Sequence, residues 1–318
     1  MAVYTPVAAA QLEHFLSAYD CGALRSYEGI RAGVSNSNFH VFTDKGRFVL
    51  TLFERRVREE DLPFFLAFTG HLAAGGIACP RAVQGRDGEA VRRLAGKPAA
   101  LITFLEGAQI EPGEIAVAHC RELGAAVARA HLAAADFQGR RPNALSLSEW
   151  RALADDTRSR ADTVAPGLAA AVDGELAFLD ENWPRRLPEA VVHADIFPDN
   201  VFFRDGRFAG FIDFYFACTE FLAYDLALTV NAWCFDAGGA WNQGKFEALM
   251  EGYGAHRGLT PEERGGFSIL CRGAAMRILM TRLYDWVFHD PKDFVTPKDP
   301  AEYLNKLRFH QNARIVPH

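Results

Sequence analysis

The pattern of apolar and polar residues changes along the chain and divides it into two parts. Residues 38–53, "NFHVFTDKGRFVLTLF", alternate as strands do and predict two strands joined by a turn at residues 44–46. Residues 58–80 predict a helix that ends at Gly75, because paired glycines there precede a proline. Residues 82–107 predict further strands between glycine-containing turns. The first part of the chain is therefore rich in strands, with one prominent helix.

The second part is mainly helical. Residues 118–134, "AHCRELGAAVARAHLAA", carry apolar side chains at helical spacing, and residues 148–182 are alanine- and charge-rich in the manner of helices. The stretch 191–214 interrupts the helices with short apolar runs, and helices follow it to the end. The order predicts an α+β fold with a small β-rich N-terminal lobe, residues 1–105, and a larger, mainly α-helical C-terminal lobe, residues 106–318.

Composition narrows the class of protein. The chain has 318 residues, of which 49% are hydrophobic and 23% charged, and a net charge of −6. These values are typical of a globular protein and argue against nucleic-acid binding, which needs a basic face. The start of the chain lacks a signal-peptide pattern, and no apolar run approaches the length of a membrane span, so no membrane partner is expected.

The cysteines occur singly along the chain. They stand at Cys21, Cys79, Cys120, Cys218, Cys234 and Cys271. Scattered cysteines in a chain of this length are typical of reduced, buried thiols, which indicates a cytoplasmic protein. The absence of paired ligands in the sequence argues against a zinc site.

Residues 191–214, "VVHADIFPDNVFFRDGRFAGFIDF", place several acids beside apolar strands. Asp205-Gly206 predicts a two-residue hairpin turn. With that turn, Asn200 faces Phe211, and Asp213 lies on the same face as Asn200 at the open end of the hairpin. Diagonal neighbours of this kind have Cβ atoms about 7–8 Å apart, so one cation could contact both. Asp195 lies in the preceding loop, near the same end.

This set of oxygen-bearing side chains is suited to phosphoryl transfer. One Asp and one Asn suit Mg²⁺, which completes its shell with water and phosphate. A third carboxylate, Asp195, suits a base that orients a hydroxyl group. The alternatives are that these residues are only turn and cap residues, or that His193 and Asp195 belong to a metal hydrolase. The joint pattern H-x-D-x-x-x-x-N, followed by a hairpin and "ID", favours phosphoryl transfer.

The motifs "HADIFPDNVFF", "GFIDF" and "FLAYDLA" resemble those of the aminoglycoside-phosphotransferase/choline-kinase family. The likeness covers most of the chain, including "HLAAGGIACP" and "LGAAVARAH". It implies a protein-kinase-like two-lobed fold, with ATP bound by the N-terminal lobe and catalysis and substrate binding in the C-terminal lobe. The pieces "GVSNSNFHVFTDKGRFVLTLFE", "NAWCF" and "MRILMTRLYDW" are similar to the homoserine kinases of that family, which implies ATP-dependent phosphorylation of L-homoserine toward threonine.

The resemblance assigns roles to residues of the C-terminal lobe. Asp195 becomes the catalytic base, and His193 braces the catalytic loop. Asn200 and Asp213 hold Mg²⁺. Asp225, in "YDLA", becomes a structural acid that ties the catalytic loop to the helices.

In the N-terminal lobe, the resemblance implies two contacts with ATP. The segment "TFLEG", beginning with Thr103, Phe104 and Leu105, would be the hinge whose backbone meets adenine. The loop "GVSNSN" would approach the phosphates through small residues. They are Gly33, Ser35, Asn36 and Ser37.

The chain departs from the kinase pattern at the strand position that usually carries a phosphate-contacting lysine. Thr51 stands there and supplies no cation. Arg55, Arg56 or Lys45 could replace that lysine, or the metal could neutralise more of the charge. The helix glutamate, Glu59 or Glu60, is also left without an obvious partner.

An amino-acid acceptor requires partners for a carboxylate and an ammonium. Arg277 and Arg282 are candidates for the carboxylate; about 140° separates them on a helix, so at most one is expected to face the substrate. For the ammonium, the candidates are Glu220, Asp199 and Asp225.

Other assignments stay open on the sequence alone. The acceptor could be choline, ethanolamine, a sugar or an aminoglycoside. The missing lysine also leaves room for a nucleotide-binding pseudokinase that acts as a scaffold. A protein kinase is disfavoured, because no A-P-E-like segment follows Asp213.

Overall fold

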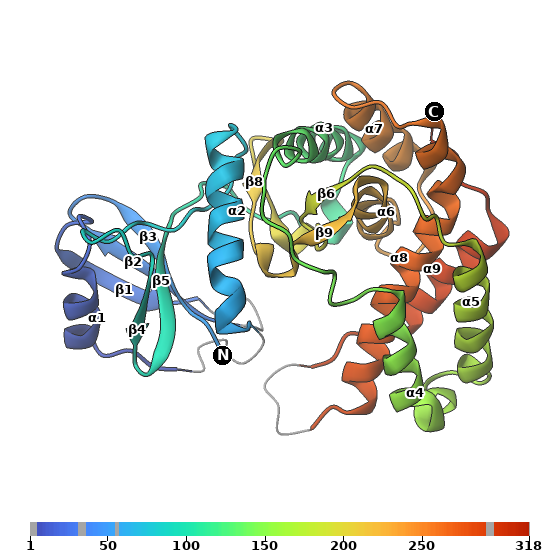
Figure 1. The fold of residues 1–318 in the computed structure, drawn as a ribbon, viewed down its shortest axis with the longest axis horizontal. Coiled ribbons are helices and arrows are strands. Elements are labelled where there is room, and N and C mark those ends of the chain that lie inside the picture. The colour runs from blue at the N-terminus through green and yellow to red at the C-terminus, as the bar shows by residue number, and fades with distance from the viewer. Residues whose placement is uncertain (1–4, 31–35, 55–56, 291–295, 318) are drawn as a thin grey trace. The chain divides into compact units, whose positions relative to one another are not determined.

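The computed structural model describes residues 5–30, 36–54, 57–290 and 296–317. Contacts within the chain divide it into two compact units, residues 1–106 and 107–318. Figure 1 shows the strands of the first unit and the helices of the second. No helix among the described residues is long and apolar enough to cross a membrane.

The N-terminal unit is built on an antiparallel five-stranded sheet with the strand order β1-β2-β3-β5-β4. Its strands are β1 (Leu24–Gly29), β2 (Ser37–Thr43), β3 (Arg47–Leu52), β4 (Val91–Leu94) and β5 (Lys97–Thr103). Its helices are α1 (Ala9–Leu16), α2 (Leu62–Ala74) and the short η1 (Glu59–Asp61). The predicted hairpin of residues 38–53 and the helix that ends at Gly75 are confirmed.

The structure contains α1 and β1, which were not predicted from the sequence. Helix α1 has only eight residues, and it buries Leu12, Phe15 and Leu16. These side chains pack with Val41 and Leu50 of the sheet in one apolar cluster. A helix this short is marginal on its own, so it is the packing on the sheet that stabilises it.

The C-terminal unit consists mainly of helices. They are α3 (Val117–Ala133), α4 (Leu147–Val164), α5 (Leu168–Asn182), α6 (Leu222–Trp233), α7 (Gln243–Gly254), α8 (Pro261–Val287) and α9 (Ala301–Asn312), with the short η2 (Pro112–Glu114), η3 (Pro198–Asn200) and η4 (Phe214–Phe216). Helix α8 packs against α4, α6 and α9, and α3 packs against α7. A capping box fixes the start of α8, where Thr260 and Glu263 satisfy each other's backbone N–H groups.

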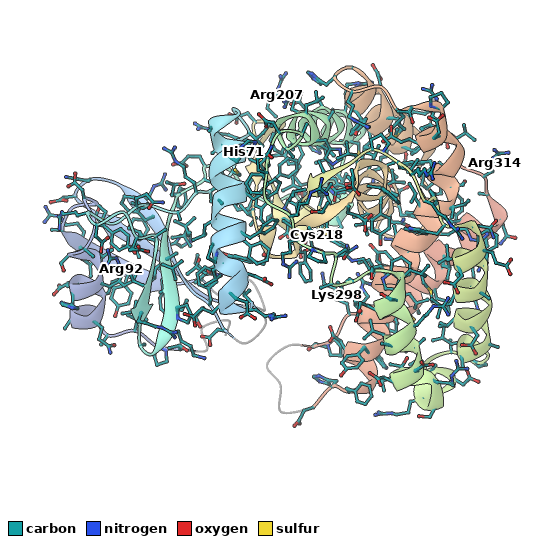
Figure 2. All side chains as sticks on the ribbon, viewed as in Figure 1. His71, Arg92, Arg207, Cys218, Lys298 and Arg314 are labelled. Carbon is teal, nitrogen blue, oxygen red and sulfur yellow. The ribbon has the colours of Figure 1, made fainter. Side chains whose placement is uncertain are left out.

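Two small sheets stand among these helices. Strand β6 (Glu189–Val192) pairs with β9 (Cys218–Phe221), and β7 (Val201–Arg204) pairs with β8 (Arg207–Phe211). Figure 2 marks Cys218 at the start of β9. The loop between β6 and β7 and the loop after β8 therefore both begin at strand ends, where side chains can be held in place.

The predicted pairing within the β7–β8 hairpin is wrong at its open end. Phe203 pairs with Phe208, as a two-residue turn at Asp205-Gly206 requires, but a bulge then shifts the register, and Phe202 pairs with Gly210. Ala209 is the extra residue on β8, as in a β-bulge, where two residues on one strand oppose one on the other. Asn200 consequently meets Ile212 instead of Phe211, with its carbonyl accepting the Ile212 N–H at 3.0 Å.

Glycines allow α3 and α7 to pack closely, and we expect Gly252→Ala to destabilise the protein. A Cβ at Gly252 would lie 2.0 Å from the Arg121 carbonyl oxygen, so the helices must move apart. Overpacking of this kind typically costs about 1–3 kcal/mol. Gly254→Ala on the same helix is the control, because a Cβ there has open space. Urea unfolding should show a loss for the first variant alone; equal stabilities would contradict this packing.

Candidate active site

The loop between β6 and β7 is organised by His193. Burial lowers the pKa of His193, so the ring is neutral near pH 7. Its Nε2 lies 2.9 Å from the Ile212 carbonyl oxygen, and its Nδ1 lies 3.2 Å from the Asp195 amide nitrogen. The neutral tautomer with a proton on Nε2 satisfies both contacts: it donates to Ile212 and accepts from Asp195. His193 therefore links the Asp195 loop to the residue that precedes Asp213.

Asp195 is half-buried, and its carboxylate accepts a hydrogen bond from the side chain of Asn200. Asn200 donates from Nδ2 to Asp195 Oδ2 and to the Asp195 carbonyl oxygen, both at 2.9 Å. The pKa of Asp195 is raised to about 7, chiefly by burial and also by the charges of Asp213 and Asp199, while the positive charge of Arg277 opposes the shift. A carboxylate with such a pKa is suited to accepting a proton near neutral pH.

Asp213 follows β8 in a left-handed backbone conformation, with φ of 61°. It is exposed to solvent, yet the surrounding protein limits the solvation of its carboxylate and raises its pKa to about 6. Because Asn200 is bonded through its backbone to Ile212, Asn200 and Asp213 are neighbours across the hairpin end. The side-chain amide nitrogen of Asn200 donates its hydrogen bonds to Asp195, so the amide oxygen is the atom that remains to coordinate a cation. The amide oxygen and the Asp213 carboxylate form a donor set that fits Mg²⁺.

A buried chain of polar side chains holds the Asp195 loop from behind. Ala194 has a φ of 61°, which is costly for a residue other than glycine, and its N–H donates to Asp225 Oδ1 at 2.7 Å. Asp225 Oδ2 lies 2.9 Å from His131 Nε2, and His131 Nδ1 lies 2.9 Å from the Tyr253 hydroxyl. Arg257 donates one hydrogen bond to that hydroxyl and another to Glu263 at the start of α8. These contacts are consistent with the structural acid that the resemblance implied at Asp225, and that role stays a prediction.

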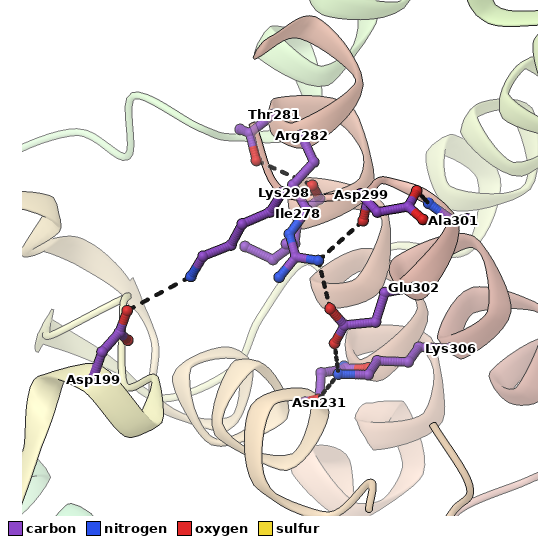
Figure 3. A network of polar contacts seen from close by, with 10 residues as sticks. All are labelled: Asp199, Asn231, Ile278, Thr281, Arg282, Lys298, Asp299, Ala301, Glu302 and Lys306. Atoms are coloured by element: carbon purple, nitrogen blue, oxygen red, sulfur yellow. Dashed lines mark hydrogen bonds and ion pairs between the residues drawn. The ribbon is translucent and has the colours of Figure 1, made fainter. Parts of the chain in front are cut away.

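Arg282 and Lys298 lie in a network of polar contacts (Figure 3). Arg282 donates to Glu302 Oε2 at 2.6 Å and to the Asp299 carbonyl oxygen at 3.2 Å, and its guanidinium lies 4.5 Å from the centre of the Tyr303 ring. Lys298 Nζ lies 3.6 Å from Asp199 Oδ2, and both side chains are exposed. Arg282 is thus engaged within the protein, and Asp199 already has a cationic neighbour.

Arg277 differs from Arg282 in its surroundings. It lies on α8 with 1% of its surface exposed, and its Nε and Nη1 atoms have no hydrogen-bond partner among the described residues. Its guanidinium carbon lies 5.8 Å from the centre of the Phe216 ring in η4, directly after Asp213. Asn231 and Trp233 are core residues: Trp233 Nε1 donates to the Ile196 carbonyl oxygen at 2.9 Å.

Glu220 lines a cavity of about 260 Å³ in the C-terminal unit. Its carboxylate accepts from Asn143 Nδ2 at 2.9 Å and from the Phe221 N–H at 2.8 Å. The other residues that line the cavity are Asn143, Ser146, Leu147, Ser148, Trp150, Trp183 and Tyr224. Aromatic rings beside one carboxylate suit an ammonium group.

Of the loop residues predicted to meet phosphate, Gly33 and Ser35 lie outside the described residues. Asn36 and Ser37 are described and buried at the start of β2. Ser37 Oγ donates to Glu54 Oε1 at 2.8 Å, and Lys97 Nζ lies 3.0 Å from Glu54 Oε2. Strand pairing brings Ser37, Leu52 and Ala99 to one end of the sheet. Lys97 begins β5 at this same end, so it places a positive charge near the start of β2.

Lys97 was not among the cations predicted to replace the missing lysine, because only the pairing of β3 with β5 brings it to this end of the sheet. Thr51, at the usual lysine position, is buried and donates to Asn38 Oδ1 at 2.8 Å. Lys45 lies in the turn at the opposite end of β2 and β3 and pairs with Asp20. Arg55 and Arg56 lie outside the described residues.

The expectation that the helix glutamates lack partners is wrong. Glu59 pairs with Arg93 at 2.7 Å, and Glu60 pairs with Arg58. All four side chains are exposed, so these pairs contribute little to stability.

The expected hinge residues Thr103, Phe104 and Leu105 begin at the end of β5, and each is half-buried. The Thr103 side chain accepts the Arg81 N–H at 3.0 Å. The Arg47 guanidinium lies 4.4 Å from the centre of the Phe104 ring. These contacts fix the end of the strand and leave the adenine-binding role as a prediction.

Comparisons with known proteins agree on the family. The model of the phosphotransferase enzyme family matches residues 26–259. The chain is 53% identical over 311 residues to a homoserine kinase of Xanthobacter autotrophicus, covering 98% of this chain and 96% of that protein. It is also 53% identical over 317 residues to a homoserine kinase of Bradyrhizobium diazoefficiens, covering 99% and 96% of the two chains.

Solved structures are similar in fold. An amicoumacin kinase in complex with AMP-PNP and Ca²⁺ is 15% identical, with a TM-score of 0.68 over 96% of this chain and 92% of that one. A choline kinase of Cryptosporidium parvum is 12% identical, with a TM-score of 0.65 over 90% and 88% of the two chains. The expected α+β, protein-kinase-like fold is confirmed. The chain belongs to the phosphotransferase enzyme family, as its motifs indicated.

Proposed function

We propose that the protein transfers the γ-phosphoryl group of ATP to the side-chain hydroxyl of L-homoserine, giving ADP and O-phospho-L-homoserine. The observation that carries the proposal is the arrangement of Asp195, Asn200 and Asp213 at the open end of the β7–β8 hairpin. The names of relatives about half identical over nearly the full length support the acceptor.

In the proposed reaction, the acceptor oxygen forms a bond to the γ-phosphorus while the bond to the β–γ bridging oxygen breaks. The hydroxyl proton passes to the Asp195 carboxylate, which His193 and Asn200 hold in place. Asn200 Oδ1 and Asp213 would hold Mg²⁺, which neutralises charge on the phosphates when it is bound. Positioning and charge neutralisation should account for most of the rate, as is usual in phosphoryl transfer.

In the N-terminal unit, Asn36 and Ser37 would lie beside the phosphates and the backbone of Thr103, Phe104 and Leu105 beside adenine. Lys97 would supply the cation that Thr51 does not. The ion pair between Lys97 and Glu54, together with the hydrogen bond from Ser37 to Glu54, supports this assignment.

We expect Lys97→Met to raise the KM for ATP about tenfold, because a fixed charge near the phosphates is lost. The KM for L-homoserine should stay within about twofold. The matched control is Lys45→Met, which removes a lysine from the opposite end of the same sheet. Steady-state kinetics with varied ATP measure the effect, and an equal rise in both variants would argue against Lys97.

The experiment that tests the proposed function is ADP release from Mg-ATP with a panel of acceptors. The panel contains L-homoserine, D-homoserine, choline, ethanolamine and kanamycin, and Asp195→Asn serves as the inactive control. Turnover selective for L-homoserine supports the proposal. Turnover with another alcohol moves the substrate but keeps the mechanism, and ATP binding without any turnover favours a pseudokinase.

A further inference from the structure

Arg277 is a buried cation whose surroundings do not complete its hydrogen bonding. Among the buried side chains that the structure describes, it is the one that leaves two nitrogen atoms, Nε and Nη1, unpartnered. A buried charge without a partner is strongly unfavourable, and arginine presents its donors as a planar fork that matches a carboxylate. These features indicate that an anion completes the site when substrate is present.

The position of Arg277 connects this anion to the reacting groups. The Phe216 ring beside its guanidinium belongs to η4, which Asp213 caps. The charge of Arg277 acts on the Asp195 carboxyl, and of the cations that lower the pKa of Asp195 it has the larger effect, ahead of Lys298. Arg277 therefore lies beside the segment that follows Asp213 and within electrostatic reach of the proposed base.

Tyr224 joins Arg277 to the cavity that Glu220 lines. Tyr224 is one of the residues that line the cavity, and its buried hydroxyl lies next to the Arg277 guanidinium. Burial raises the pKa of Tyr224, and the neighbouring Arg277 guanidinium opposes that shift. The Arg277 cation, the Tyr224 hydroxyl and the Glu220 carboxylate thus follow one another, and an amino-acid zwitterion needs a cation for its carboxylate and a carboxylate for its ammonium.

Arg282 and Lys298 are poorer candidates for binding the carboxylate. Arg282 already has Glu302, a backbone carbonyl and the Tyr303 ring as partners (Figure 3). The Lys298 side chain is 65% exposed and lies beside Asp199 (Figure 3). An exposed lysine can attract an anion, but it provides little discrimination between an acceptor with a carboxylate and one without.

We propose that Arg277 binds the α-carboxylate of the acceptor and thereby selects an amino acid over the corresponding amino alcohol. This inference rests on the proposed function and specifies the group that the site recognises. Because homoserine is short, its carboxylate must lie near Asp195 whenever its hydroxyl does. With Glu220 facing the ammonium, the Arg277 fork would fix the third point of the acceptor and orient its hydroxyl.

The test compares L-homoserine with 3-aminopropan-1-ol, which lacks only the carboxylate. Both acceptors are assayed with the wild-type protein, Arg277→Met and Arg277→Lys. The control is Arg264→Met, which removes an exposed arginine from the same helix. The quantity that decides is the ratio of kcat/KM for the two acceptors. This ratio cancels any effect of Arg277 on Asp195 that both acceptors share.

We expect Arg277→Met to lower kcat/KM for L-homoserine about 10²–10³-fold and to change that for 3-aminopropan-1-ol less than about threefold. Arg277→Lys should recover part of the preference, because it restores the charge but not the fork. Arg264→Met should keep the wild-type ratio. An equal loss for both acceptors, or no loss, would overturn the inference and leave Arg277 a residue that tunes Asp195.

A measurement on the wild-type protein alone covers the case in which the Arg277 variants do not fold. L-Homoserinamide keeps the ammonium and the hydroxyl but carries no negative charge. It should be phosphorylated at least about 10²-fold less efficiently than L-homoserine. Similar efficiencies would overturn the carboxylate assignment while the proposed function stands. A wild-type protein that phosphorylates none of the three acceptors would instead reject the proposed function.

Discussion

Asp195→Asn should lower kcat about 10²–10⁴-fold while the protein stays folded, because the acceptor hydroxyl loses the group that takes its proton. The substitution is nearly isosteric, and an asparagine oxygen can still accept the hydrogen bond that Asn200 donates. The KM for ATP should change little. Stopped-time assays of ADP formation at saturating ATP and L-homoserine measure the effect.

Two measurements distinguish this loss of activity from a loss of folded protein. Burial raises the pKa of Asp195 to about 7, above its unfolded value, so ionising it at pH 8 is unfavourable in the folded state. The thermal midpoint of the Asn variant at pH 8 should therefore be no lower than that of the wild type. The matched control is Asp205→Asn, which removes an exposed carboxylate at the hairpin turn and should keep full activity. Near-wild-type turnover by Asp195→Asn would remove Asp195 from the role of base.

Asp213→Asn should raise the Mg²⁺ concentration needed for half-maximal activity at least about tenfold and lower kcat, because the cation loses its charged ligand. Asparagine tolerates the left-handed backbone conformation of this residue, so the loop is expected to keep its shape. Titration of activity with Mg²⁺ at fixed free ATP gives the comparison.

The same titration on Asp205→Asn controls for the loss of one negative charge elsewhere on the same hairpin. Binding of Mg-ADP measured by calorimetry provides a second readout that does not depend on turnover. An unchanged Mg²⁺ titration for Asp213→Asn would assign the cation to other ligands.

The sequence was informative where local patterns determine the structure. Short apolar runs separated by turn residues predicted the β2–β3 and β7–β8 hairpins. The paired glycines before a proline predicted the end of α2, and helical spacing predicted α3. The motif around His193 and Asp195 located the candidate site, because its residues lie close together in the chain.

The sequence was less informative where distant segments meet. The bulge at Ala209 changes which residue faces Asn200, and a turn signal does not reveal a bulge farther along the strand. Strand pairing between β3 and β5 brings Lys97 into an ion pair with Glu54, although 43 positions separate the two residues in the sequence. Arg277 and Arg282 are indistinguishable as residue types, and only their partners separate a buried, unpaired guanidinium from an engaged one.

The most direct test of the central claim follows the phosphoryl group itself. The protein is incubated with Mg-ATP labelled at the γ-phosphate and with L-homoserine, and the products are separated and identified by phosphorus NMR. We predict that the label appears in O-phospho-L-homoserine with the wild-type protein and is reduced to near background with Asp195→Asn. Label that is recovered only as inorganic phosphate, or in the product at equal rates with both proteins, would contradict the proposed reaction.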